Sequence, residues 1–324
     1  MIVIATTSDN RGSPPGLPEG LADYLATVRR ALGPPRSLEE IRLIADRDAH
    51  LLAYPRPAGM AVFDTIVVAA GANVRLYRPT GDGTGPAILY WHGGGFTTGS
   101  IDSYDGLATA LAEATAATVI SVDYARLPET TPRAMLQQAY EILAWAHRQA
   151  DLLGIDGTQL AIAGDSAGAF LAAHLAVLAR DRGGPAIACQ LLCYGVYDLD
   201  SGREGHAAAH DPVLPRPVID AMIATYRACA ARDDAPLPAP LGIADLSRLP
   251  PAILLGAALD PMLAEAGDYA QRLRAAGGTA VERVAPGMCH GFLRAVRFSA
   301  PARAEMGWLG RAFRDLLQPS RTAL

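Results

Sequence analysis

Lysine is absent from this chain of 324 residues, so all 28 of its basic side chains are arginine. This absence excludes reactions that need a lysine amine, such as Schiff-base formation, Ser-Lys dyads and phosphate binding by a P-loop lysine. The 33 acidic residues give a net charge of −5. Because nucleic-acid binding requires a basic face, we expect no nucleic-acid partner.

Cysteines and long apolar runs are also scarce. The four cysteines are too scattered for a disulfide framework, so we expect reduced thiols in a cytoplasmic protein. No apolar run approaches the ~20 residues that span a bilayer, so we expect no membrane association. Residues 1–8 lack both the basic start and the apolar stretch of a signal peptide.

From about residue 61 onward, short apolar stretches alternate with helical patterns. Strands followed by helices predict a mostly parallel sheet with helices on both faces, which is an α/β fold. The expected strands lie at 62–68, 74–77, 87–91, 118–124, 160–163, 187–194, 252–259 and 281–284. The expected helices lie at 104–114, 132–153, 166–182, 264–276 and 302–317.

Two segments fall outside this alternation. Before the first strand, residues 21–32 and 37–45 carry helical periodicity, and Ser37 has capping-box spacing to Glu40. Residues 199–250 contain a loop, one helical stretch and several prolines. An insertion of this size between strands is typical of a lid over a site.

The most informative motif is Gly-Asp-Ser-Ala-Gly at residues 164–168, which fits the pattern G-x-S-x-G. In this pattern the serine sits on a sharp turn between a strand and a helix, with its hydroxyl above the sheet. The strand expected at 160–163 and the helix expected to follow provide that setting. We therefore predict that Ser166 is a nucleophile; the alternative is a serine that only caps the helix.

A serine hydroxyl is a weak nucleophile and needs a neighbouring base. In α/β-hydrolases the serine is followed along the chain by the acid and then by the histidine. His290 lies in a loop after the last expected strand, and Asp260 lies after the preceding strand. We predict that His290 accepts the Ser166 proton, and that Asp260 orients His290 and stabilises its charged form.

A second glycine turn, His-Gly-Gly-Gly-Phe at residues 92–96, follows the strand expected at 87–91. Its N–H groups are placed to stabilise the oxyanion of a tetrahedral intermediate. A dinucleotide-binding interpretation fails, because G-x-G-x-x-G spacing would require glycine where Thr98 stands. The predicted oxyanion hole therefore consists of the N–H of Ala167 and of N–H groups from among Gly93, Gly94 and Gly95. The sequence favours Gly94 but does not fix which of the three glycines donate.

Two further patterns contain residue types that occur in functional sites. His206 and His210 have i,i+4 spacing with Asp211 beside them, but no metalloprotease base accompanies them. We interpret them as polar loop residues and expect no metal. Cys289 adjoins His290, and its neighbours suggest packing. No Walker sequence is present, and we expect no cofactor.

Taken together, these motifs resemble those of the bacterial hormone-sensitive-lipase-like esterases, a family of the α/β-hydrolase superfamily. The resemblance covers roughly residues 60–318 and includes Asp-Tyr at 123–124 with Pro-Glu at 128–129. Its four ordered motifs are the glycine turn at 92–96, the serine turn at 164–168, Leu-Asp-Pro at 259–261 and His-Gly-Phe at 290–292.

The resemblance implies an α/β-hydrolase fold with an eight-stranded, mostly parallel sheet flanked by helices and covered by a helical cap. Residues 1–55 and 199–250 would be the cap segments, and residues 56–198 and 251–324 the catalytic domain. The implied reaction is cofactor-free hydrolysis of short- to medium-chain carboxylic esters through an acyl-enzyme on Ser166. The resemblance also implies a small-molecule ester substrate and a homodimer.

Several positions depart from the family pattern. Ala169 and Phe170 replace the usual Gly-Asn, the arginine of the Tyr-Arg-Leu-Ala-Pro-Glu run is displaced to Arg126, Ala264 replaces an acidic residue, and Gly195 replaces a proline. None of these changes removes a predicted catalytic group, but they leave the substrate preference open. The expected pocket residues are Phe96, Phe170, Met222, Tyr226 and Phe292.

Other functions use the same residues. An amidase, a lactonase or a deacetylase would share the three predicted catalytic groups, and the sequence does not separate them from an esterase. A non-catalytic ligand-binding protein on a hydrolase scaffold is disfavoured because His290 is present. An interfacial lipase is disfavoured because the helix expected at 217–230 carries Asp220 and Arg227.

Overall fold

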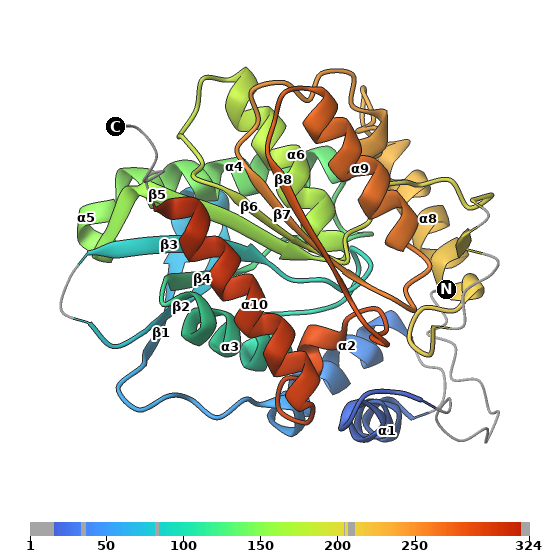
Figure 1. Ribbon diagram of the computed structural model, residues 1–324. Helices are drawn as coiled ribbons and strands as arrows, with labels where there is room; N and C mark the ends of the chain where they lie inside the picture. Colours follow the sequence, from blue (N-terminus) through green and yellow to red (C-terminus); the bar gives the residue numbers. More distant parts are fainter. Residues whose placement is uncertain (1–15, 34–36, 82–83, 204, 207–210, 319–324) are drawn as a thin grey trace.

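The computed structural model describes residues 16–33, 37–81, 84–203, 205–206 and 211–318. In these residues eight strands form one sheet, in the order β1-β2-β4-β3-β5-β6-β7-β8 (Figure 1). The strands are β1 (Ala61–Val67), β2 (Ala72–Arg78), β3 (Gly85–Trp91), β4 (Thr118–Asp123), β5 (Ile155–Asp165), β6 (Gln190–Cys193), β7 (Ala252–Ala257) and β8 (Ala280–Ala285).

Most of the sheet is parallel. Strand β2 is antiparallel to both β1 and β4, and every pair from β4 through β3 to β8 is parallel. All six residues of the inner strand β7 are buried, whereas the edge strand β1 is largely exposed. This difference explains the near-continuous apolar runs of the inner strands. The predicted eight-stranded, mostly parallel sheet is confirmed.

Helices cover both faces of the sheet (Figure 1). One face packs against α3 (Asp105–Thr115) and α10 (Ala300–Leu317), and the other against α4 (Pro132–Arg148) and α6 (Ala167–Asp181). The alternation is visible along β3, where Ile88 and Tyr90 join the α3–α10 cluster and Leu89 and Trp91 join the other. Between β7 and β8 the chain forms α9 (Leu263–Ala275).

Some predicted boundaries differ from the structure. The helix expected at 132–153 ends at Arg148, because Gln149 leaves helical geometry with φ −101° and ψ 15°. A separate turn of helix, α5 (Ala150–Leu153), follows and ends at the left-handed Gly154. Strand β5 starts five residues before the predicted strand and continues to Asp165, so it reaches the serine turn directly.

Three helices outside the alternating pattern lie at the right of Figure 1. They are α1 (Leu21–Leu32), α2 (Leu38–Arg47) and α8 (Arg216–Ala230). The predicted capping box at the start of α2 is confirmed, with Ser37 and Glu40 bonded reciprocally. Within the described ranges, no helix has both the length and the apolar character needed to cross a membrane.

Candidate active site

Ser166 occupies the turn between β5 and α6, with φ 54° and ψ −120°. A non-glycine residue is rarely held at positive φ, and such strain is characteristic of functional turns. The turn is tight enough to require its glycines. A Cβ on Gly164 would collide with the backbone of Gly168, and one on Gly168 would collide with the carbonyl oxygen of Trp91. The small residues around Ser166 therefore permit the geometry that points its hydroxyl away from the sheet.

Ser166, His290 and Asp260 form one hydrogen-bonded chain. The imidazole Nδ1 of His290 lies 2.7 Å from Asp260 Oδ2, and its Nε2 lies 2.8 Å from Ser166 Oγ. Because a carboxylate only accepts, Nδ1 carries a proton, and in the neutral ring Nε2 is free to accept the hydroxyl proton of Ser166. All three residues are buried. The structure thus brings together the three residues predicted as nucleophile, base and acid.

The loops that carry His290 and Asp260 are fixed by backbone bonds. Asp260 follows β7, and its Oδ1 accepts from the N–H of Met262 at 2.9 Å. His290 lies in the loop after β8, and its N–H donates to Oδ2 of Asp211 at 2.6 Å. The other oxygen of Asp211 accepts from the N–H groups of Val213 and Leu214. A carboxylate from the segment 199–250 therefore fixes the backbone of the predicted base.

The environment favours the charged form of His290. Burial alone would lower its pKa. The charge and hydrogen bond of Asp260, followed by the charges of Asp211 and Asp165, outweigh burial and raise the pKa of His290 to about 9. An imidazolium that forms by taking a proton from Ser166 is thereby stabilised.

The glycine turn after β3 is tied to the serine turn. The N–H of Gly93 donates to Asp165 Oδ1 at 2.7 Å, and the hydroxyl of Tyr90 donates to the same oxygen at 2.6 Å. The Gly93 N–H is thus already engaged by a carboxylate. In the described part of the chain, no acceptor is bonded to the N–H groups of Gly94, Gly95 or Ala167, so these three stay available as oxyanion donors.

His92, the first residue of the turn, is held by ring packing and a backbone hydrogen bond. Its ring packs between Tyr104 and Tyr124, and its Nδ1–H donates to the carbonyl oxygen of Gly93 at 2.8 Å. Burial lowers the pKa of His92 to about 3. The ring is therefore neutral at ordinary pH and shapes the turn rather than exchanging protons.

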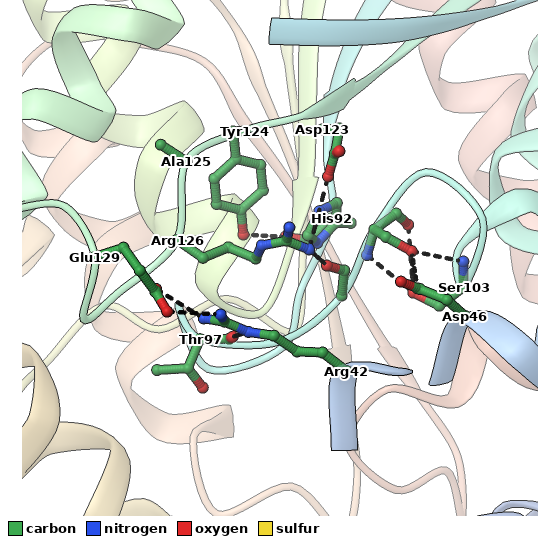
Figure 2. A network of polar contacts seen from close by, with 12 residues as sticks. Arg42, Asp46, His92, Thr97, Ser103, Asp123, Tyr124, Ala125, Arg126 and Glu129 are labelled. Atoms are coloured by element: carbon green, nitrogen blue, oxygen red, sulfur yellow. Dashed lines mark hydrogen bonds and ion pairs between the residues drawn. The ribbon is translucent and has the colours of Figure 1, made fainter. Parts of the chain in front are cut away.

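Helix α2 holds the far side of the same turn, as Figure 2 shows. Arg42 donates from Nε to the carbonyl oxygen of Thr97 at 2.7 Å and from Nη2 to that of Leu127 at 2.8 Å. Its guanidinium also forms two hydrogen bonds to the carboxylate of Glu129, at 2.8 and 3.0 Å. One arginine of α2 therefore joins the loop after β3 to the loop after β4.

Two further bonds in Figure 2 support this clamp. Asp46 of α2 accepts from the hydroxyl of Ser100, and Arg126 donates to the carbonyl oxygen of Gly99. The displaced arginine of the family pattern, Arg126, is thus part of the support of the loop. Asp123 lies 3.6 Å from the same arginine.

Four of the five predicted pocket residues lie in one cluster. The rings of Phe96, Phe170 and Tyr226 are mutually packed, with centroids 5.1 to 5.2 Å apart. Met222 of α8 lies against Gly95. All four are at most 4% exposed, so their side chains fill space beside the glycine turn. Phe292 belongs instead to the core cluster on the opposite face of the sheet, where it contacts Tyr194.

Three carboxylates near the site were given no role in the sequence prediction: Asp165, Asp211 and Glu265. Glu265 of α9 is fully buried and accepts from the N–H groups of Tyr197 and Asp198 and from the ring of His206. Asp165 could have been found from its place inside the serine motif. The bond from Asp211 to His290 crosses 79 residues, and the partners of Glu265 are 59 to 68 residues away in the chain. No local spacing therefore signals that these two carboxylates lie near the site.

His206, His210 and Cys289 were the other residues considered as possible ligands or nucleophiles on sequence grounds. His206 is bonded to Glu265, and His210 lies outside the described residues. Across the described ranges no group of three or more metal-ligating side chains is arranged to hold an ion. Burial raises the pKa of the Cys289 thiol. A buried, protonated thiol is a poor nucleophile, which fits the packing role expected for Cys289.

Sequence comparisons place this geometry among known proteins. Residues 88–294 match a protein family whose description is 'alpha/beta hydrolase fold'. The chain is 39% identical over 231 residues to carboxylesterase NlhH of Mycobacterium tuberculosis, which covers 70% of this chain and 72% of that protein. It is 35% identical over 226 residues to the ethyl acetate hydrolase of Pseudomonas putida, which covers 68% and 71%.

Solved structures give the same result. A thermostable esterase from Pseudomonas putida superposes with a TM-score of 0.85 at 26% identity, over 95% of this chain and 100% of that one. EstE1, a thermostable carboxylesterase cloned from a metagenomic library, superposes with a TM-score of 0.79 at 32% identity, over 88% and 99%.

Proposed function

Because the chain belongs to the hormone-sensitive-lipase-like branch of the α/β-hydrolase family, we propose that it hydrolyses carboxylic esters with Ser166 as its nucleophile. The observation that carries this proposal is the bonded chain from Asp260 through His290 to Ser166. Several relatives that it resembles are named carboxylesterases or esterases.

The proposed reaction has two halves. His290 Nε2 takes the proton of Ser166 as Oγ attacks the carbonyl carbon, and Asp260 stabilises the imidazolium. The oxyanion accepts from the N–H groups of Gly94, Gly95 and Ala167, each worth ~3 kcal/mol of transition-state stabilisation. His290 then protonates the leaving alkoxide, and an acyl group stays on Ser166. A water molecule, deprotonated by His290, releases the acid and restores the enzyme.

The test is removal of the nucleophile. Ser166→Ala is expected to reduce kcat toward p-nitrophenyl butyrate by roughly 10⁶-fold, because the triad acts as a unit. Ser247→Ala, outside the site, is the matched control. A serine-directed phosphonate should add its mass to the wild-type protein and to Ser247→Ala, but not to Ser166→Ala. Turnover by Ser166→Ala at a rate near that of wild type would exclude Ser166 as the nucleophile.

We propose that the acyl group is short to medium in length. The buried cluster of Phe96, Phe170 and Tyr226 supports this limit, because its packed rings fill the space on the α8 side of the glycine turn. A series of p-nitrophenyl esters of increasing chain length measures it. We expect kcat/KM to fall sharply beyond about eight carbons, and an unchanged rate for sixteen carbons would contradict the proposal.

We also propose that residues 1–55 and 199–250 form a cap over the site. Two contacts support this division: Arg42 of α2 reaches the loop after β3, and Asp211 reaches the backbone of His290. Limited proteolysis with and without a phosphonate on Ser166 would test it. Cleavage within these two segments should slow when the adduct is present.

A further inference from the structure

A cleft of about 110 Å³ opens beside the glycine turn. Its walls come from α1, from α2 with the 3₁₀ turn η1 (Ala49–Leu52), and from residues 94–104. Most of the wall is apolar, with Val28, Leu32 and Ile44 among the lining residues. Gly94 is part of the wall, so the cleft borders the turn that carries the predicted oxyanion donors.

Two charged side chains line the cleft, Asp48 and Arg294. Asp48 is bonded to the neighbouring Arg47 on both oxygens, at 2.7 Å each. Arg294 lies on the 3₁₀ turn η4 (Phe292–Ala295), four residues after His290. The charge of Asp48 is therefore already compensated, which makes Arg294 the decisive charge of the cleft.

Arg294 lacks an anionic partner within the part of the chain that the structure describes. Its guanidinium stacks on the ring of Tyr104, 4.5 Å from the centroid, and its Nη2 donates to the carbonyl oxygen of Ser103 at 3.2 Å. Its Nε is buried and has no hydrogen-bond partner. A buried donor without a partner costs free energy, more so when it is charged, so the hydrogen-bonding capacity of this guanidinium is incompletely used within the described residues.

The core carboxylate whose charge acts on Arg294 is Asp165. That carboxylate is occupied, since it accepts from Tyr90 and from the N–H of Gly93 and forms no ion pair with Arg294. The other groups that act on Arg294 are the phenols of Tyr24, Tyr90 and Tyr104. The guanidinium thus faces an apolar cleft with polar neighbours but no adjacent negative charge.

We propose that Arg294 selects esters that carry a carboxylate, and that this carboxylate binds in the cleft between α1, α2 and the glycine turn. A guanidinium pairs with a carboxylate through two parallel hydrogen bonds, and the apolar walls strengthen the pairing by excluding water. This inference rests on the proposed ester hydrolysis and narrows its substrate class to monoesters of dicarboxylic acids or acyl esters of hydroxy acids.

Matched substrates test the proposal, one pair for each half of an ester. Monoethyl succinate and ethyl succinamate differ only in a carboxylate against an amide on the acyl side. The compounds 3-acetoxybenzoate and 3-acetoxybenzamide differ in the same way on the alcohol side. We expect kcat/KM to favour the anion by about tenfold or more in one pair, and that pair identifies the half of the ester that enters the cleft.

Variants distinguish a specific effect of Arg294 on the anion preference from the effect of removing any positive charge. Arg294→Met should reduce the ratio of anion to amide to about one, and Arg294→Lys should retain part of it because the charge remains. Arg311→Met removes an exposed charge from α10 and should keep the wild-type ratio. Equal rates for anion and amide in both pairs with wild type, or a preference that survives in Arg294→Met, would overturn the proposal.

A binding measurement keeps the test independent of turnover. In Ser166→Ala, 3-acetoxybenzoate or monoethyl succinate should raise the melting temperature more than its amide, and Arg294→Gln in the same background should cancel the difference. If wild type hydrolyses no ester at all, the proposed function fails, and this measurement still decides the role of Arg294. If neutral esters are cleaved but no anion binds preferentially, only the role of Arg294 fails.

Discussion

The edge of the sheet and the segments outside it contribute to the site in different ways. Ser166, Asp260 and His290 follow the carboxyl ends of β5, β7 and β8, so strand geometry sets their positions. Arg42 and Asp211 instead reach in from α2 and from the 199–250 segment, and bond to the backbone of loops that bear the reacting groups. In the proposed reaction, residues at the sheet edge supply the chemistry and the outer segments align them.

The largest effect of this comparison is expected at the sheet edge. Asp260→Asn should reduce kcat by about 10⁴-fold, because the amide no longer fixes the reactive tautomer of His290. Steady-state kinetics with p-nitrophenyl butyrate measures the loss, and Asp245→Asn, an exposed loop residue, is the control. A loss below tenfold would mean that strand position alone does not define the acid.

A smaller effect is expected at helix α2. Arg42→Met removes the bonds to Thr97 and Leu127 and should lower kcat by about 10- to 100-fold through misplaced oxyanion donors, with little change in KM. Arg47→Met on the same helix is the matched control, because the Arg47 guanidinium is bonded to the neighbouring Asp48 and not to the glycine turn. If Arg42→Met raises only KM, Arg42 acts in substrate binding and does not position the oxyanion donors.

The smallest effect is a shift along the pH axis. Asp211 accepts three backbone N–H groups, as an ionised carboxylate does, and its charge helps to raise the pKa of His290. The base must be neutral to accept a proton, so activity rises with pH through the pKa of His290. Asp211→Asn lowers that pKa and should move the acid limb of kcat/KM to lower pH, by up to about one unit.

The direction of that shift distinguishes charge from structure. The other groups that face His290 are Asp260, Asp165, Ser166 and the ring of Tyr194, and all remain in Asp211→Asn. The amide oxygen can still accept from the His290 N–H. A variant with lower activity at every pH but an unmoved acid limb would show that Asp211 acts only through the backbone.

Chain order explains why the reacting residues could be predicted. Each of Ser166, Asp260 and His290 stands in a short motif directly after an apolar strand, and parallel strands bring such positions to one edge of the sheet. The bonds of Arg42 to its partners cross 55 to 87 residues, and no local pattern encodes them. The pocket prediction placed Phe292 with Phe170, but Phe170 lies on α6 and Phe292 on η4, which pack on opposite faces of the sheet.

Other expectations remain predictions. The homodimer and the cytoplasmic location rest on the family resemblance and on cysteine usage, respectively. The division into cap and catalytic segments has contacts that support it but awaits the proteolysis experiment. Size-exclusion chromatography with light scattering would measure the oligomeric state directly.

The glycine turn is held at two points, one on the serine turn and one on helix α2. Asp165, one residue before the nucleophile, holds its near end, and Arg42 holds its far end at Thr97. If α2 moves outward to admit an ester or release an acid, the bond from Arg42 to Thr97 breaks. The N–H groups of the glycine turn then lose their orientation toward the oxyanion, while Ser166 keeps its position. Such an enzyme would be inactive with α2 in the open position and active only in the closed one. Substrate entry and catalysis would then alternate without any additional gating element.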